Sequence, residues 1–243
     1  MQDYFIIGDI HGKYGMLKAL LDKWDGKAQL VFLGDLIDRG EDSRSVLELV
    51  QSLIREKGAW VICGNHEYMF KAWLQDPENR YDHYRRNGGD TTINSLLARP
   101  LDHPVDGIRD AQAVKDKCTD LVEMIENLPY FYEIEDAIFV HAGVDLSLDD
   151  WKATSDYDKV WIRQPFHEAA NHTGKLIFFG HTPTYSLFAE KPGFNKIWQK
   201  DQKIGLDGGA VYGGFLYGLT FSQGKIEKVD AIAHDGLALA LDD

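Results

Sequence analysis

Aspartate, asparagine and histidine side chains stand at five places where a short apolar run of the sequence ends, each time next to a glycine. The five places are Gly8-Asp9-Ile10-His11, Gly34-Asp35, Gly64-Asn65-His66, His141-Ala142-Gly143 and Gly180-His181. Glycine permits tight turns and close approach of backbones. In α/β sheets, ligands bind beyond the carboxyl ends of the strands. We therefore expect these strand ends to meet and to bring their polar side chains into one site.

The side chains at these strand ends form a mixed set of two carboxylates, one amide and three imidazoles. The candidate ligands are Asp9, His11, Asp35, Asn65, His141 and His181. Such a set suits manganese, iron or zinc better than calcium or an all-oxygen magnesium site. A shared carboxylate such as Asp35 can bridge two ions about 3.5–4 Å apart. The sequence thus predicts a centre of two divalent metal ions, manganese first and iron or zinc as alternatives.

The elements that must position these residues alternate regularly in the first third of the chain. Apolar runs at residues 4–7, 30–33 and 60–63 predict strands, and helical patterns follow the first two, with Ser43 as the expected N-cap of the second helix. Further strand-like runs lie at residues 137–140, 176–179, 203–206, 215–220 and 225–229. This pattern predicts an α/β fold with helices covering the sheet.

Residues 67–127 break this alternation and predict a helical insertion that forms a lid or rim over the site. Its aromatic residues either line a substrate groove or pack in the core, and both interpretations stay open. They include Tyr68, Phe70, Trp73, Tyr81 and Tyr84. We expect a single domain over residues 1–243 that includes this insertion.

Composition excludes several other classes of protein. The net charge of −13, from 26 basic and 39 acidic residues, disfavours a nucleic-acid partner. An anionic substrate would need local positive charge, which bound metal ions supply. The chain has no apolar run of about 20 residues, which a membrane span would need, and no basic leader of the kind that a signal peptide carries. Its two cysteines are too few for a disulfide framework, and Cys63 is expected to be buried. We expect a cytoplasmic protein with no membrane partner, for which a monomer suffices.

Five motifs together resemble the calcineurin-like metallophosphoesterase superfamily. They are GDIHG at 8–12, GDLIDRG at 34–40, GNHE at 64–67, HAG at 141–143 and GHT at 180–182. The unbroken DRG and the glutamate of GNHE look most like the serine/threonine protein phosphatase branch in its small bacterial and phage form. The resemblance implies a four-layer αββα sandwich with two mixed β-sheets and flanking helices.

The resemblance also implies a role for each motif residue. Asp9, His11 and His181 would bind one ion, Asn65 and His141 the other, and Asp35 would bridge the two.

The remaining roles concern the phosphate and the leaving group. His66 would be the general acid that protonates the leaving oxygen, and Asp38 would orient it. Arg39 and Arg163 would bind the phosphate through planar donor pairs. Tyr212 is assigned to substrate binding at the rim of the site.

The expected activity is hydrolysis of phosphate monoesters by a hydroxide that bridges the two ions. We expect a serine/threonine protein phosphatase, possibly of dual specificity, acting on a phosphoprotein or a small phosphorylated substrate. The alternative is a symmetrical dinucleoside tetraphosphate hydrolase, whose members tend to depart from DRG and to carry GNHD. A non-catalytic scaffold on the same fold is a third hypothesis, but such a protein would be expected to have lost ligands.

Overall fold

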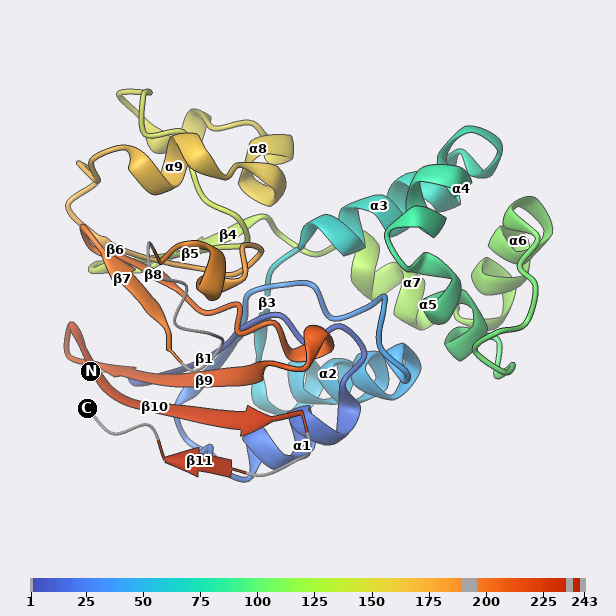
Figure 1. Cartoon of the computed structure of the whole chain (residues 1–243), viewed down its shortest axis with the longest axis horizontal. Helices are drawn as coiled ribbons and strands as arrows, with labels where there is room; N and C mark the ends of the chain where they lie inside the picture. Colours follow the sequence, from blue (N-terminus) through green and yellow to red (C-terminus); the bar gives the residue numbers. More distant parts are fainter. Residues whose placement is uncertain (1, 189–195, 235–237, 241–243) are drawn as a thin grey trace.

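The computed structural model describes residues 2–188, 196–234 and 238–240. In this part of the chain the strands form two mixed sheets, with the strand orders β11-β10-β9-β1-β2-β3 and β4-β5-β6-β8-β7 (Figure 1). The strands are β1 (Tyr4–Ile7), β2 (Gln29–Phe32), β3 (Trp60–Val61), β4 (Phe131–Glu133), β5 (Ala137–Val140), β6 (Leu176–Phe179), β7 (Trp198–Lys200), β8 (Lys203–Gly205), β9 (Phe215–Ser222), β10 (Lys225–Ala233) and β11 (Ala238–Ala240). The helices are α1 (Tyr14–Leu21), α2 (Ser43–Lys57), α3 (Asn65–Gln75), α4 (Pro77–Arg86), α5 (Gly89–Leu96), α6 (Gly107–Lys117), α7 (Thr119–Glu126), α8 (Asp156–Trp161) and α9 (Gln164–Glu168).

The strands that lead into the predicted site run parallel to one another within each sheet. In the first sheet β1 pairs with β2 and β2 with β3, and in the second β5 pairs with β6 and β6 with β8. Their carboxyl ends therefore share one edge of each sheet. Every strand predicted from the sequence is present. Three strands of three residues each, β4, β7 and β11, were not predicted from the sequence.

Alternate residues of β1 show how the layers are built. Phe5 and Ile7 belong to the core beneath the helices α1 and α2, whereas Ile6 belongs to the core between the two sheets. Such alternation is expected for a strand buried on both faces. A third core, which includes Phe166 and Phe179, lies between the second sheet and the helices that follow β5. The predicted αββα sandwich is confirmed.

Helix α2 begins one residue earlier than the sequence suggested. Its N-cap is Asp42, whose Oδ1 accepts a hydrogen bond from the backbone N–H of Ser45 at 3.1 Å. Ser43 was therefore the wrong N-cap. A preceding carboxylate can reach the free N–H groups of the first turn, which leaves the Ser43 hydroxyl to bond Thr92 Oγ1 at 2.9 Å.

The segment that was predicted as a helical insertion carries helices α3 to α7, which lie together at one side of the sheets (Figure 1). We call these helices the helical lobe. Its core is aromatic: Phe70, Trp73 and Tyr84 are fully buried, and the rings of Trp73 and Tyr84 stack at 5.3 Å. Tyr68 and Tyr81 are only partly buried. None of the helices in the described residues is long and apolar enough to cross a membrane.

Candidate metal centre

The five strand ends meet, and the predicted ligands are all buried. Asp9 and His11 follow β1, Asp35 follows β2, and Asn65 opens α3 directly after β3. His141 and His181 follow β5 and β6 of the other sheet. The exposed fractions are 3% for Asp9, 4% for His11, 2% for Asp35, 3% for Asn65, 0% for His141 and 5% for His181. Six hydrophilic side chains thus face one another out of contact with solvent.

Close contacts between the loops explain the glycines that precede the ligands. A Cβ added to Gly180 would lie 2.1 Å from Oδ1 of Asp9. A Cβ added to Gly34 would lie 2.6 Å from the backbone nitrogen of Gly64, and Gly34 has a φ of +99°. Only glycine fits either position without displacing a ligand or a ligand-bearing loop.

Several site residues themselves occupy the left-handed region of backbone conformation. The φ angles are 48° at His11, 50° at Asp35, 72° at Asp38, 68° at Arg39 and 64° at His181. Residues other than glycine adopt this region at a cost of order 1–3 kcal/mol, and such residues cluster at functional sites. The turns after β1, β2 and β6 are therefore shaped for the site and not for local stability.

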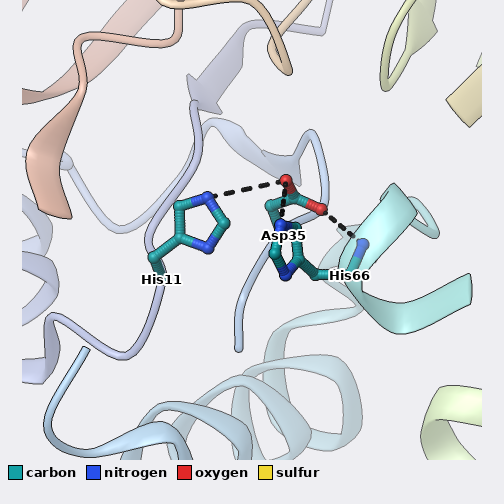
Figure 2. Close-up of side chains that lie close together, drawn as sticks. All are labelled: His11, Asp35 and His66. Atoms are coloured by element: carbon teal, nitrogen blue, oxygen red, sulfur yellow. Dashed lines mark hydrogen bonds and ion pairs between the residues drawn. The ribbon is translucent and has the colours of Figure 1, made fainter. Parts of the chain in front are cut away.

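Asp35 lies at the centre of the site, where its carboxylate faces the rings of both His11 and His66 (Figure 2). Its Oδ2 is 3.6 Å from Nε2 of His11, and its Oδ1 is 3.4 Å from Nε2 of His141. The two oxygens of one carboxylate thus face imidazoles on opposite sides. This is the geometry that a bridging carboxylate requires.

Two groups of side chains among the described residues could hold a metal ion: one contains Asp35, His141 and His181, and the other contains His11, Asp35 and His66. The first group converges on Asn65. Its Oδ1 lies 3.0 Å from Nε2 of His141 and 2.9 Å from Nδ1 of His181. Nδ1 of His141 donates to the carbonyl oxygen of Leu33 at 2.8 Å, so Nε2 carries a lone pair. A lone pair and an amide oxygen facing each other at this distance repel unless a cation lies between them. The residues therefore fit a bound metal ion.

The ring of His181 belongs to this group, together with Asp35 and His141. His181 was predicted to share an ion with Asp9 and His11, but its ring lies with Asp35 and His141 instead. The link between His181 and Asp9 is through the backbone, because the N–H of His181 donates to Oδ1 and Oδ2 of Asp9 at 3.1 and 3.0 Å.

The second ligand group contains His11. Its Nδ1 donates to the carbonyl oxygen of Ile37 at 2.9 Å, which leaves the Nε2 lone pair facing the site. That lone pair accepts a hydrogen bond from Nη1 of Arg39 at 2.9 Å. A cation bound to Nε2 would compete with this bond and would free the guanidinium for an anionic ligand.

Burial and charge shift the ionisation of the ligand groups in a consistent way. Burial raises the pKa of Asp9 well above its usual value, and the neighbouring charges of Asp207 and Asp35 add to this shift. Burial likewise raises the pKa of Asp207 to about 6. A bound cation would offset the excess negative charge at Asp9 and Asp207 and lower both pKa values. Burial also lowers the pKa values of His11 and His141, which keeps their rings neutral and able to bind metal.

The predicted proton donor lies beside this centre. Nδ1 of His66 donates to Oδ2 of Asp38 at 2.7 Å, and both residues are fully buried. Nε2 of His66 has no hydrogen-bond partner among the described residues and lies 4.0 Å from Oδ2 of Asp35. The ring is therefore oriented with its second nitrogen toward the metal centre.

The sequence analysis quoted Glu67 only as a letter of the GNHE motif, but the structure gives it a definite role. Its carboxylate is fully buried and accepts backbone N–H groups from Asp35, Leu36 and Gly64 at 2.8–2.9 Å. Burial, with the charge of Asp35, raises the pKa of Glu67 to about 7. Its place at the third position of α3, after a glycine N-cap, was the available signal.

The two predicted arginines come from different loops, Arg39 from the one after β2 and Arg163 from the one between α8 and α9. The guanidinium of Arg39 lies 5.5 Å from the ring centre of Tyr212, whose side chain is 53% exposed. Nη1 of Arg163 donates to Oγ1 of Thr182, directly after His181, at 3.0 Å. Tyr212 is thus half-exposed beside Arg39, and its part in substrate binding stays a prediction.

Comparison with known proteins agrees with this site. The family model described as Calcineurin-like phosphoesterase matches residues 4–214. The chain is 27% identical over 247 residues to bis(5'-nucleosyl)-tetraphosphatase PrpE [asymmetrical] of Halalkalibacterium halodurans, covering 90% of this chain and 89% of the relative. It is 29% identical over 225 residues to serine/threonine-protein phosphatase 1 of Salmonella typhimurium, covering 87% and 88%.

Solved structures show the same fold. The cold-active protein-tyrosine phosphatase of a psychrophilic Shewanella superposes with a TM-score of 0.62 at 17% identity, over all of this chain and 81% of that one. The family match extends over all of the strand-end motifs that carry the ligands. The chain therefore belongs to the calcineurin-like phosphoesterases, hydrolases of phosphate esters that use a dinuclear metal site.

Proposed function

We propose that this chain is a serine/threonine protein phosphatase that hydrolyses phosphate monoesters. The observation that carries the proposal is the pair of His66 and Asp38, with Nε2 of His66 directed to the centre 4.0 Å from Oδ2 of Asp35. A serine or threonine alkoxide is a poor leaving group and needs a proton as the phosphorus–oxygen bond breaks. A nucleotide phosphate leaves readily without one. A buried, oriented proton donor therefore favours alkyl esters.

Two bound divalent cations would supply Lewis acidity and a nucleophile at neutral pH. Asn65, His141 and His181 would hold one ion, Asp9 and His11 the other, with Asp35 between them. Manganese is the proposed metal, because nitrogen and oxygen ligands of this kind suit it. Iron and zinc are the alternatives.

The chain's own residues bind the phosphate and move the proton. Arg39 and Arg163 would donate to the phosphate oxygens from two sides, which stabilises charge that develops on them. As water adds to phosphorus, the ester bond breaks and the leaving oxygen takes the proton from Nε2 of His66. The alcohol departs, and the ring regains a proton from the water that hydrolysis consumes. Asp38 keeps Nδ1 of the ring protonated throughout.

A second candidate is hydrolysis of dinucleoside tetraphosphates, which one observation favours. The ring of Tyr157 is 57% exposed and stacks on Trp161 at 6.1 Å, and Trp161 contacts His181 at 5.8 Å. An exposed aromatic pair beside a metal ligand could stack on a nucleobase. The relative from Halalkalibacterium carries the name of such an enzyme.

The two candidates separate in a steady-state comparison of a phosphoserine peptide with diadenosine tetraphosphate, both with manganese present. We expect kcat/KM for the peptide to exceed that for the dinucleotide. Efficient cleavage of the dinucleotide alone would refute the protein phosphatase proposal and establish the second candidate.

A further inference from the structure

Helices α4 and α5 of the helical lobe contact the predicted proton donor, which lies on α3, through a single carboxylate. Oδ1 of Asp38 accepts hydrogen bonds from the hydroxyl of Tyr84 and from Oγ1 of Thr92, both at 2.7 Å. Oδ2 of the same carboxylate accepts Nδ1–H of His66 at 2.7 Å. Asp38 is fully buried, so these three donors replace water around its charge. All three lie in the helical lobe: His66 on α3, Tyr84 on α4 and Thr92 on α5.

The direction of each hydrogen bond around Thr92 follows from the number of protons and lone pairs on its hydroxyl. Its Oγ1 accepts the backbone N–H of Asp38 at 2.8 Å and contacts the hydroxyl of Ser43 at 2.9 Å. A hydroxyl has one proton and two lone pairs. Since Thr92 gives its proton to the carboxylate, Ser43 must donate to Thr92. The chain of donors therefore runs from Ser43 through Thr92 to Asp38.

The position of Tyr84 is fixed by packing on all sides. Its ring is fully buried, stacks on Trp73 at 5.3 Å and meets Phe70 edge-on at 6.0 Å. A Cβ added to Gly89 would lie 2.5 Å from the Tyr84 ring, so the ring fits here only because residue 89 has no side chain. A phenylalanine would fill the same space. The hydroxyl is thus needed only for its bond to Asp38.

The lobe also supports the strained backbone that carries the carboxylate. Asp38 and Arg39 both have positive φ angles, 72° and 68°. The N–H of Arg39 donates to the carbonyl oxygen of Gly88 at 3.3 Å, and a Cβ on Gly88 would lie 2.8 Å from Cγ of Arg39. Such strain persists only where surrounding contacts over-determine the conformation. The start of α5 provides those contacts.

We propose that Tyr84 and Thr92 are positioning residues for the proton transfer, which makes helices α4 and α5 a support for the catalytic acid on α3. They hold the Asp38 carboxylate so that His66 keeps Nδ1 on Asp38 and Nε2 toward the metal centre. This inference rests on the proposed function, in which His66 protonates the leaving oxygen. Loss of either hydroxyl should therefore slow the hydrolysis of esters whose leaving group needs a proton. Hydrolysis of esters whose leaving group departs without one should be unaffected.

The test compares Tyr84→Phe and Thr92→Val with wild type on phenyl phosphate, a poor leaving group, and p-nitrophenyl phosphate, a good one. We expect kcat on phenyl phosphate to fall about tenfold in each variant. This is the lower end of the roughly 10–100-fold loss that is usual when a group that orients another is removed. KM for both substrates and kcat on p-nitrophenyl phosphate should stay near wild type. Thr92→Ser, which keeps the hydroxyl, should restore most of the rate.

The matched control is Tyr81→Phe, in the same lobe. Its hydroxyl donates to Asp90 at 2.9 Å, away from Asp38, and its removal should leave the ratio of the two rates unchanged. An equal fall on both substrates in Tyr84→Phe, or no fall on either, would overturn the proposal. Failure of wild type on a phosphoserine peptide would instead refute the proposed function.

A second measurement does not depend on turnover. In the zinc-loaded protein, the Nδ1 proton of His66 should give a downfield proton NMR signal that is absent from His66→Asn. Tyr84→Phe should shift this signal, because Asp38 becomes a stronger acceptor toward His66 when it loses a donor. Tyr81→Phe should not shift it. An unmoved signal in Tyr84→Phe would also overturn the proposal.

Discussion

Replacing Glu67 with glutamine should destabilise the whole site, because one carboxylate holds two ligand-bearing loops together. Oε2 accepts the N–H groups of Asp35 and Gly64, each at 2.9 Å, and Oε1 accepts that of Leu36 at 2.8 Å. Glutamine has a single oxygen, so at least one N–H would face the side-chain NH2. These bonds connect the loops that follow β2 and β3, which carry two of the predicted ligands.

The magnitude follows from those contacts. An orphaned buried N–H costs about 1–3 kcal/mol, and two bonds that lose a charged acceptor weaken by about 1 kcal/mol each. The neutral amide recovers part of this, because burial raises the pKa of Glu67 to about 7 and so disfavours its charged form. The net loss should be about 2–4 kcal/mol, or roughly 5–12 °C in Tm for a chain of this size.

Thermal unfolding followed by circular dichroism, with EDTA present, separates this effect from metal binding. Glu126→Gln is the matched control, since Glu126 is exposed in the last turn of α7 and should change the free energy of unfolding by less than about 0.5 kcal/mol. A Glu67→Gln protein that unfolds within about 1 °C of wild type would refute the idea that the carboxylate holds the loops.

Three further predictions concern single side chains. His66→Asn should keep its bound metal by elemental analysis and lose about a hundredfold in kcat on phenyl phosphate, and an unchanged rate would reject His66 as the acid. Gly180→Ala should weaken metal binding in a calorimetric titration, because its Cβ would displace the Asp9 carboxylate, whereas Gly15→Ala, whose Cβ meets nothing within 4 Å, should not. Burial, with Arg163 and Lys203 nearby, lowers the pKa of His167 to about 4, below the usual value of about 6.5. Its contribution to stability is therefore present above pH 6.5 and lost as the pH falls to 4. The loss is at most about 3 kcal/mol, less because the ring is partly exposed, and should be missing from urea unfolding of His167→Gln with EDTA present.

The ligands could be predicted from the sequence because each stands directly after an apolar run and beside a glycine. Parallel strands place their carboxyl ends at one edge, so strand order hardly matters for bringing Asp9, Asp35 and Asn65 together. Which of the two metal ions each histidine would bind could not be predicted. That depends on the direction of the His181 ring, set by a φ of 64° and by contact with Trp161, and neither leaves a pattern in the sequence.

Burial by distant segments explains the other differences. His167 lies in an irregular stretch of sequence that is typical of a surface position, but Phe179 and Trp198 from β6 and β7 cover its ring, and the residue is 9% exposed. The hydroxyls of Tyr84 and Thr92 likewise reach Asp38 from 46 and 54 residues away. The aromatic residues of the insertion were open to a role in a groove or in a core, and only the fold could show that they form a core that also contacts the site.

The central claim is that these strand ends form a dinuclear metal centre on which phosphate-ester hydrolysis depends. The most direct test is to titrate manganese into protein stripped with EDTA while measuring the bound ions per chain and the rate on p-nitrophenyl phosphate. We expect two ions per chain and activity that appears only with bound metal. Asp35→Asn, which weakens the carboxylate between both ligand groups, should bind fewer ions and lose activity. Full activity in the stripped protein, or undiminished occupancy of two ions in Asp35→Asn, would contradict the account.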